Sequence, residues 1–202
     1  MKKFTSLFLS IMLCLALCAC SDGNDVSENK SETTTEPFVY ETTTAAAVGS
    51  KAEKLSFESE DIYGNKVSDS IFKSSKLTVI NVWGTFCSPC IAEMPYLAEL
   101  SDEYNKADVQ FVGLVIDAAD YYGNIDDSIV EDARSIAEKT KADYTHILPM
   151  NELLVFSNSF FSVPTTVFVN SEGELVSSSV VGSRDKEEWK SIIDSVLEGV
   201  SK

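Results

Sequence analysis

The feature that most constrains this chain is a pair of almost wholly apolar segments with a helical stretch between them. The segments cover residues 77–83 (LTVINVW) and 109–116 (VQFVGLVI), and both are rich in β-branched side chains. Such runs are typical of strands that are buried on both faces of a sheet. Between them, residues 91–104 carry apolar side chains at helical spacing. We therefore predict a β-α-β unit at the centre of an α/β domain.

Weaker patterns lie on both sides of this unit. Apolar and polar residues alternate from residue 55, and the pair Gly64-Asn65 separates two short apolar stretches, which predicts a hairpin in front of the unit. Ser128 and Glu131 have the spacing of a capping box for a helix over residues 129–140. We expect that helix to be an insert in the middle of the domain.

The last part of the chain predicts a second hairpin and a closing helix. Residues 166–169 and 175–181 are apolar and flank a turn over residues 171–174. An amphipathic helix is expected around Trp189, with its end at Gly199. The order β-α-β-α followed by β-β-α resembles the thioredoxin fold, an α/β fold, with an added N-terminal β-hairpin and a central helical insert.

The amino terminus predicts a targeting signal. Residues 1–19 begin with two lysines, continue as an apolar run and are too short to span a membrane as a mature helix. The tetrapeptide that ends at Cys20 (LCAC) resembles a bacterial lipobox, which implies a lipoprotein signal peptide over 1–19 and a lipid anchor on Cys20. Cys14 and Cys18 each follow a leucine and do not fit that pattern. The alternative is an ordinary signal peptide that leaves Cys20 as a spare thiol.

Residues 20–50 predict a disordered, acidic tether rich in threonine and serine. This stretch has no apolar periodicity and cannot bury enough surface to offset its ordering entropy. The remaining residues, 51–202, suffice for one thioredoxin-like domain. The whole chain has 16 basic and 32 acidic residues, a formal net charge of -16. This acidity excludes nucleic acid as a partner, because phosphate binding needs a basic surface.

Two of the five cysteines, Cys87 and Cys90, lie at the predicted strand-to-helix junction. The first turn of the helix offers N–H groups and a positive dipole end that favour the thiolate of Cys87. A spacing of three residues puts both sulfurs on one helical face, so that Cys87 can attack a disulfide and Cys90 can resolve the product. A zinc site would need more ligands, and a haem attachment would need histidine at Ile91. A purely structural disulfide remains the main alternative.

The segment from Trp83 to Pro95 (WGTFCSPCIAEMP) resembles the active-site segment of membrane-anchored TlpA/ResA-like proteins of the thioredoxin superfamily. The similarity extends over roughly residues 53–199. It implies a thiol-disulfide oxidoreductase that works without a cofactor or metal and reduces disulfides in exported proteins. Apocytochrome c and a methionine sulfoxide reductase are the kinds of partner expected. A membrane protein that donates electrons would recharge it at the extracytoplasmic face of the cell membrane.

The same resemblance implies roles for residues around the dithiol. Glu93 matches the buried acid of this family, and we expect it to accept the proton of Cys90; the alternative is a solvated surface glutamate. Pro164 matches the cis-proline beside the dithiol. Its cis bond would turn the backbone of Val163 toward the sulfurs, where an extended substrate could pair with it.

Further residues are expected to have structural roles. Trp83 and Phe86 are expected to form walls of the site and to contact substrate, and Pro95 to kink the first long helix. Neither His146 nor Asp117 has a partner that spacing reveals, and we assign no chemical role to either.

The alternatives to this function are two other activities of the same fold and a binding module with a vestigial dithiol. A peroxide-reducing enzyme would resemble the pattern Pro-x-x-x-Thr-x-x-Cys, but Ile80 and Gly84 occupy the first two positions here. A copper-binding chaperone would need three residues between its cysteines, and this chain has two.

The lipobox predicts that Cys20 holds the protein at the membrane. Replacing Cys20 with alanine should move the protein from the membrane fraction to the soluble fraction, because the acyl chains are lost. Fractionation followed by immunoblotting measures this, and exchange activity in solution should be retained. Continued retention of the variant in the membrane would contradict the prediction.

Overall fold

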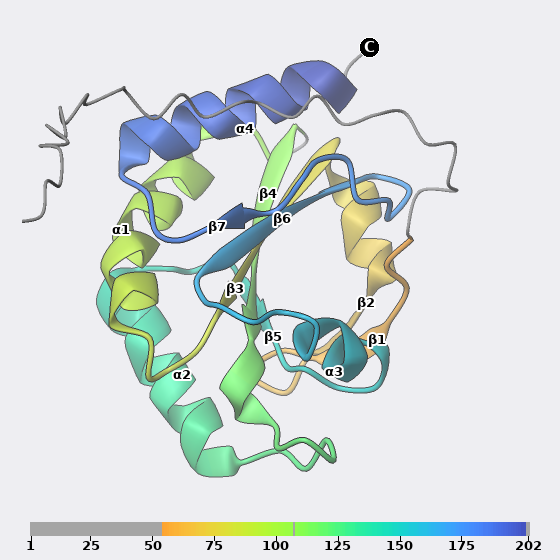
Figure 1. Cartoon of the computed structure of the whole chain (residues 1–202), viewed down its shortest axis with the longest axis vertical. Coiled ribbons are helices and arrows are strands. Elements are labelled where there is room, and N and C mark those ends of the chain that lie inside the picture. Colours follow the sequence, from red (N-terminus) through yellow and green to blue (C-terminus); the bar gives the residue numbers. More distant parts are fainter. Residues whose placement is uncertain (1–53, 107, 201–202) are drawn as a thin grey trace, which may run out of the picture. The chain divides into compact units, whose positions relative to one another are not determined.

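The computed structural model describes residues 54–106 and 108–200, and the predicted signal peptide, Cys20 and the whole predicted tether lie outside them. Its core is one mixed sheet with the strand order β5-β4-β3-β6-β7 (Figure 1). β3 is parallel to β4, which is parallel to β5, whereas β6 is antiparallel to both β3 and β7. The strands are β3 (Leu77–Trp83), β4 (Val109–Val115), β5 (Thr145–Ile147), β6 (Thr165–Asn170) and β7 (Val180–Val181).

Helices cover one face of the sheet, and a smaller layer covers the other (Figure 1). α1 (Ser88–Glu103), α2 (Asp127–Thr140) and α4 (Lys186–Val200) form the first layer. The second layer holds the hairpin β1 (Glu58–Glu60) and β2 (Lys66–Ser68), the 3-10 helix η1 (Asp69–Ser74) and α3 (Glu152–Ser157). This arrangement confirms the thioredoxin-like α/β architecture with its leading hairpin and central insert.

Every residue of β3 is buried, as its continuous apolar run predicts. Successive side chains of a strand point to opposite faces, so Val79 and Trp83 pack under the helices while Ile80 and Val82 pack toward α3 and the hairpin. Both faces of β3 therefore contribute to the hydrophobic core, and its carboxyl end carries the residues that lead to the dithiol.

Three tight turns in the fold share one hydrogen-bonding pattern. In the first, the Asp61 carboxylate accepts from the N–H groups of Tyr63 and Asn65, and the Asn65 side chain donates back to it. The turn that begins at Asp120 repeats this arrangement. In the turn that begins at Asn170, the side-chain oxygen accepts from two N–H groups in the same way, but Asn170 Nδ2 donates to the Glu174 carboxylate. The fourth residue is a glycine with positive φ in each, which is why glycine is favoured there. The first of these turns confirms the predicted hairpin.

The cap of α2 differs from the prediction. Asp126, not Ser128, is the N-cap, and its carboxylate accepts from the N–H groups of Ser128 and Ile129. Glu131, the expected capping partner, instead forms an ion pair with Arg134. The proposed capping box was wrong because a better acceptor, a carboxylate, stands two residues earlier.

The last two elements also depart from the prediction. Gly199 lies within α4, which runs on to Val200, so this glycine does not end the helix. The second arm of the expected hairpin is mostly irregular, because only an isolated bridge between Val169 and Leu175 precedes the two residues of β7. β5 and α3 were not predicted, since each is short and neither has a distinct periodicity.

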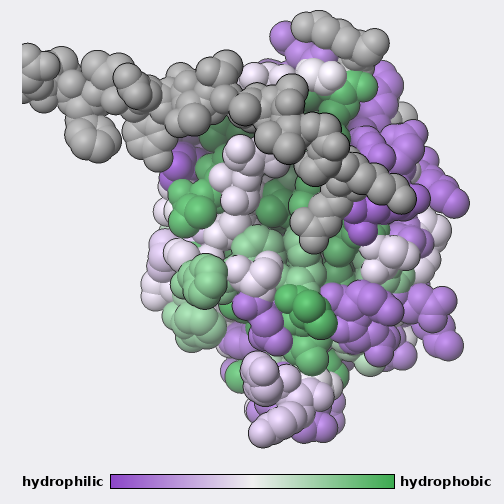
Figure 2. Space-filling model, turned by 45° about the vertical axis from the view of Figure 1, so that its right-hand side comes forward, coloured by the Kyte–Doolittle hydropathy of each residue, from purple (hydrophilic) through white to green (hydrophobic). Residues whose placement is uncertain are grey.

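Several large apolar side chains remain exposed on the described part of the domain. The space-filling view shows apolar residues reaching the surface beside strongly hydrophilic ones (Figure 2). The exposed large apolar residues are Tyr63, Phe86, Tyr96, Tyr121, Tyr122, Val155, Phe161 and Val181. Across residues 54–106 and 108–200, no helix has the length and apolar character needed to cross a membrane.

Candidate active site

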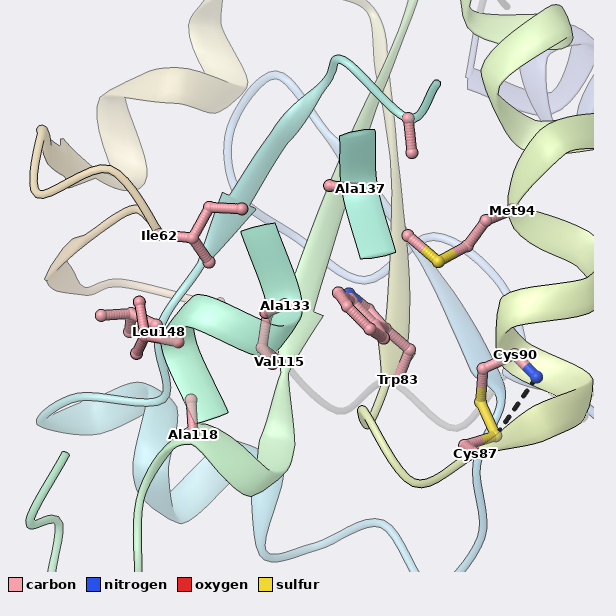
Figure 3. Close-up of a cluster of buried hydrophobic side chains, with 12 residues drawn as sticks. Ile62, Trp83, Cys87, Cys90, Met94, Val115, Ala118, Ala133, Ala137 and Leu148 are labelled. Atoms are coloured by element: carbon pink, nitrogen blue, oxygen red, sulfur yellow. Dashed lines mark hydrogen bonds between the residues drawn. A yellow bond between two sulfur atoms is a disulfide. The ribbon is translucent and has the colours of Figure 1, made fainter. Parts of the chain in front are cut away.

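Cys87 and Cys90 form a disulfide where β3 gives way to α1 (Figure 3). Their Cα atoms are 5.3 Å apart. Cys87 is the N-cap of α1, and its sulfur accepts a hydrogen bond from the Cys90 N–H at 3.2 Å. Cys87 is 5% exposed and Cys90 is fully buried. The pair thus has an outer sulfur that a helix N-terminus supports and an inner sulfur beneath it.

The loop before Cys87 is held by hydrogen bonds to the end of β4. The carboxylate of Asp117, in the 3-10 helix η2 (Ile116–Ala118), accepts from the Thr85 N–H at 3.0 Å and from the Thr85 hydroxyl at 2.6 Å. Cys87 N–H also donates to the Gly84 carbonyl at 3.0 Å. The sequence assigned no role to Asp117. Because the parallel strands β3 and β4 end side by side, Asp117 lies next to the loop that precedes Cys87.

Glu93 is buried on the same side of α1 as Cys90, with an exposed fraction of 1%. One carboxylate oxygen accepts from Asn81 Nδ2 at 3.0 Å, and the other accepts from the Arg184 N–H and Trp189 Nε1, both at 3.1 Å. Burial raises the pKa of Glu93, although these donors partly offset the effect. The alternative of a solvated surface glutamate is therefore wrong.

Asn81 was missed as a residue of this site because it looks like one more position of an apolar strand. Its side-chain nitrogen bridges Glu93 and the hydroxyl of Thr166, to which it donates at 3.2 Å. Its Oδ1 atom is buried and has no hydrogen-bond partner among the described residues. A polar residue in a buried strand is the signal that could have found it, since such groups need buried partners.

The segment around Pro164 lies against the dithiol. The Val163–Pro164 peptide bond is cis, as the family resemblance implies. Val163 packs against the apolar cluster that contains Cys87 and Cys90. The Pro164 carbonyl accepts from the Gly182 N–H at 2.9 Å, which fixes the start of β6.

The two aromatic residues that precede the dithiol have different surroundings. Trp83 is completely buried and packs in the cluster behind the disulfide (Figure 3). Phe86 is 69% exposed. Of these two aromatic residues, both expected to contact substrate, only Phe86 is accessible in this structure, and Trp83 forms an internal wall.

Pro95 lies inside α1, which continues past it for two further turns.

No group of three or more His, Cys, Asp or Glu side chains within the described residues is arranged to hold a metal ion. What the site offers is a dithiol with one outer and one inner sulfur, a helix N-terminus and a buried carboxyl group. These are the parts that thiol–disulfide exchange requires.

The fold and the dithiol define a thiol-disulfide oxidoreductase of the thioredoxin superfamily. The Redoxin family model matches residues 47–197, so this chain belongs to that family. Among curated relatives, the thiol-disulfide oxidoreductase ResA of Geobacillus kaustophilus is 27% identical over 153 residues, covering 76% of this chain and 80% of the relative. ResA of Bacillus cereus is 23% identical over 154 residues, covering 73% and 82%.

Solved structures support the fold. StoA from Bacillus subtilis has a TM-score of 0.53 at 21% identity and covers 70% of this chain and 98% of its own. A thiol:disulfide interchange protein of the thioredoxin family from Chlorobium tepidum has a TM-score of 0.59 at 18% identity, covering 74% and 99%. Together with the curated relatives, these findings identify the chain as a ResA/TlpA-like protein-disulfide oxidoreductase.

The burial of Glu93 predicts a pH dependence of stability. Because its pKa is raised in the fold, its favourable contribution is complete below the unfolded pKa of about 4.5 and is lost as pH rises toward the folded pKa. The free energy of unfolding of oxidised Glu93→Gln, relative to wild type, should therefore increase as pH rises above 4.5. Urea unfolding at several pH values measures this.

Asp102→Asn, which removes an exposed charge from the same helix, provides the baseline for that comparison. A relative stability of Glu93→Gln that stays constant or decreases with rising pH would contradict a buried carboxyl with a raised pKa.

Proposed function

We propose that this protein is a lipid-anchored reductant of disulfides in exported proteins, acting at the extracytoplasmic face of the cell membrane. The observation that carries the proposal is the asymmetry of the dithiol: Cys87 caps the helix and is 5% exposed, while Cys90 lies fully buried on the face of α1 that also carries Glu93. The predicted signal peptide and the resemblance to a lipobox support the location, and the similarity to ResA proteins supports the chemistry.

In the first step, the thiolate of reduced Cys87 attacks one sulfur of a substrate disulfide. The new Cys87–substrate bond forms as the substrate disulfide breaks, and the second substrate sulfur leaves as a thiolate that takes a proton from water. The Cys90 N–H and the N-terminus of α1 favour the attacking thiolate. Phe86, Val163 and the backbone beside Pro164 form the surface available to the substrate segment.

In the second step, Cys90 attacks the sulfur of Cys87 in the mixed disulfide. Glu93 accepts the proton of Cys90, and its raised pKa makes it a competent base nearer to neutral pH than an ordinary glutamate. The Cys87–Cys90 disulfide forms and the substrate leaves with both sulfurs reduced, so two electrons pass to the substrate. A membrane protein carrying a dithiol then returns two electrons to Cys87 and Cys90.

The direction of electron flow follows from the surroundings of Cys87. A strong oxidant needs a highly stabilised thiolate, because a stable reduced form makes the disulfide a better electron acceptor. Here proline, Pro89, precedes Cys90, and the histidine found at that position in strong oxidants is absent. The buried Glu93 on the same helix further disfavours a second negative charge nearby. These features favour a reductant, with apocytochrome c or an extracytoplasmic methionine sulfoxide reductase as the kinds of substrate.

Trapping tests the proposed activity on exported proteins. In Cys90→Ala the resolving sulfur is gone, so Cys87 should remain joined to its substrate as a mixed disulfide. We expect adducts that dithiothreitol releases and that mass spectrometry identifies as exported proteins with paired cysteines. Cys87→Ala is the matched control. Adducts that also form in this control, or no adducts with Cys90→Ala, would count against the proposal.

The reduction potential tests the direction. Equilibration with glutathione or dithiothreitol buffers should give a value near that of thioredoxin, about -270 mV, because Pro89 offers no positive charge to stabilise the Cys87 thiolate. Pro89→His, which adds a group able to stabilise the thiolate, should make the potential less negative. A wild-type value above about -180 mV, that of a disulfide isomerase, would mean that the protein is not a reductant.

A further inference from the structure

His146 is the one histidine of the chain, and no step described so far uses it. It lies in β5 directly opposite Gly113 of β4 and is 2% exposed. Its side chain points to the helix-covered face of the sheet, the same face as Trp83, whose ring centroid is 5.5 Å away. A buried imidazole needs hydrogen-bond partners for both nitrogens, and this one has them.

The two partners of His146 fix its protonation. Nδ1 accepts from the indole Nε1–H of Trp83 at 3.2 Å, and Nε2 lies 3.0 Å from the Ala142 carbonyl. An indole N–H is only a donor and a carbonyl is only an acceptor. Nδ1 must therefore be unprotonated and Nε2 must carry the hydrogen. A charged imidazolium would place a second N–H against the indole and break this bond.

The fold makes space for this contact by the absence of a side chain at position 113. A Cβ atom at Gly113 would lie 2.1 Å from His146 Nδ1 and 2.9 Å from Trp83 Nε1. Real atoms do not approach so closely, so any other residue at this position would displace the imidazole or the indole. Gly113 has an ordinary negative φ and is not needed for its backbone conformation. Its role is to admit the hydrogen bond between the two rings.

Trp83 connects this bond to the dithiol. Its indole is completely buried in the cluster that includes Cys87, Cys90 and Met94. Figure 3 shows the ring between the disulfide and the small side chains of α2. Ala133 and Ala137 of α2 belong to this cluster together with the larger Met94 and Val115, so packing and the hydrogen bond to His146 both act on the ring.

We propose that His146 is a positioning residue for thiol–disulfide exchange, because its Nδ1 atom holds the Trp83 indole in a single orientation behind Cys87 and Cys90. This inference depends on exchange at that dithiol but not on its direction or on the partner. The indole of Trp83 then keeps the same position when Cys90 changes between its thiol and disulfide forms. Loss of the bond would leave a buried N–H unpaired and release the ring.

The surroundings of His146 keep it neutral. Burial lowers its pKa to about 4, against a smaller opposite effect from the Ala142 carbonyl and Asp61. Tyr144 also faces the ring, with the two ring centroids 4.7 Å apart, and burial raises the pKa of Tyr144. Both effects favour the neutral imidazole at neutral pH, which is the form that accepts from Trp83.

Two amide variants separate the two hydrogen bonds of the ring. In His146→Asn the amide oxygen can occupy the place of Nδ1 and accept from Trp83. In His146→Gln the longer side chain reaches the place of Nε2 and retains only the bond to Ala142. We expect the Asn variant to exchange disulfides at least about fivefold faster than the Gln variant, the factor that one hydrogen bond corresponds to. The rate of dithiothreitol oxidation by the full chain measures this.

The indole N–H resonances distinguish positioning from general stability. The chain has two tryptophans, and Trp83→Phe assigns their signals. In wild type and His146→Asn the Trp83 signal should lie downfield, as for a hydrogen-bonded indole, and in His146→Gln it should move upfield. Equal exchange rates in the two amide variants, or an unchanged Trp83 signal in both, would overturn the proposal.

If either variant does not fold, the wild-type chain decides the question. Labelling with 15N-histidine gives signals from a single ring, because the chain has one histidine. The proposal requires the Nε2–H tautomer at pH 7, with a coupling between Nδ1 and the Trp83 N–H. The Nδ1–H tautomer or a charged ring at pH 7 would overturn it. Because this readout involves no substrate, it is independent of whether the protein reduces exported proteins.

Discussion

The burial of β3 on both faces determines how the polar groups around it must be arranged. No side chain of this strand reaches water, so each of its polar groups needs a partner inside the protein. Thr78 accepts from Gln110, Asn81 donates to Glu93 and Thr166, and Trp83 donates to His146. The bonds of Asn81 and Trp83 lie on the face that α1 covers, and they extend toward the dithiol at the end of the strand.

Two buried networks thus support the site from within. One holds a carboxyl group, Glu93, through donors from β3, α4 and the residue Arg184 just before it. The other holds an aromatic wall through a neutral imidazole. In the proposed mechanism, the first network supplies the proton acceptor for Cys90, and the second keeps the Trp83 indole in one orientation. Exchange chemistry benefits from both, since a reacting dithiol needs a proton acceptor and a fixed geometry.

The long elements and the dithiol were predictable from the sequence because their signals are local. The apolar runs of β3 and β4 and the cysteine pair at a strand-to-helix junction need no knowledge of distant residues. The prediction of the N-cap of α2 was wrong because Asp126 and Ser128 are both residue types that are favoured at a helix N-cap. Asn81, Asp117 and His146 could not be placed, since their partners are 12, 32 and 63 residues away and become neighbours only through strand register and helix packing.

The contact between Gly113 and the His146 ring also limits how this fold can vary. A side chain at position 113 and an imidazole at position 146 would compete for the same volume, so the two positions cannot be substituted independently. With alanine at 113, no acceptor atom fits at the place of His146 Nδ1, so the hydrogen bond from the indole of Trp83 is lost. The residue at position 113 of β4 therefore limits which residues position 146 of β5 can hold, although neither residue takes part in the exchange steps.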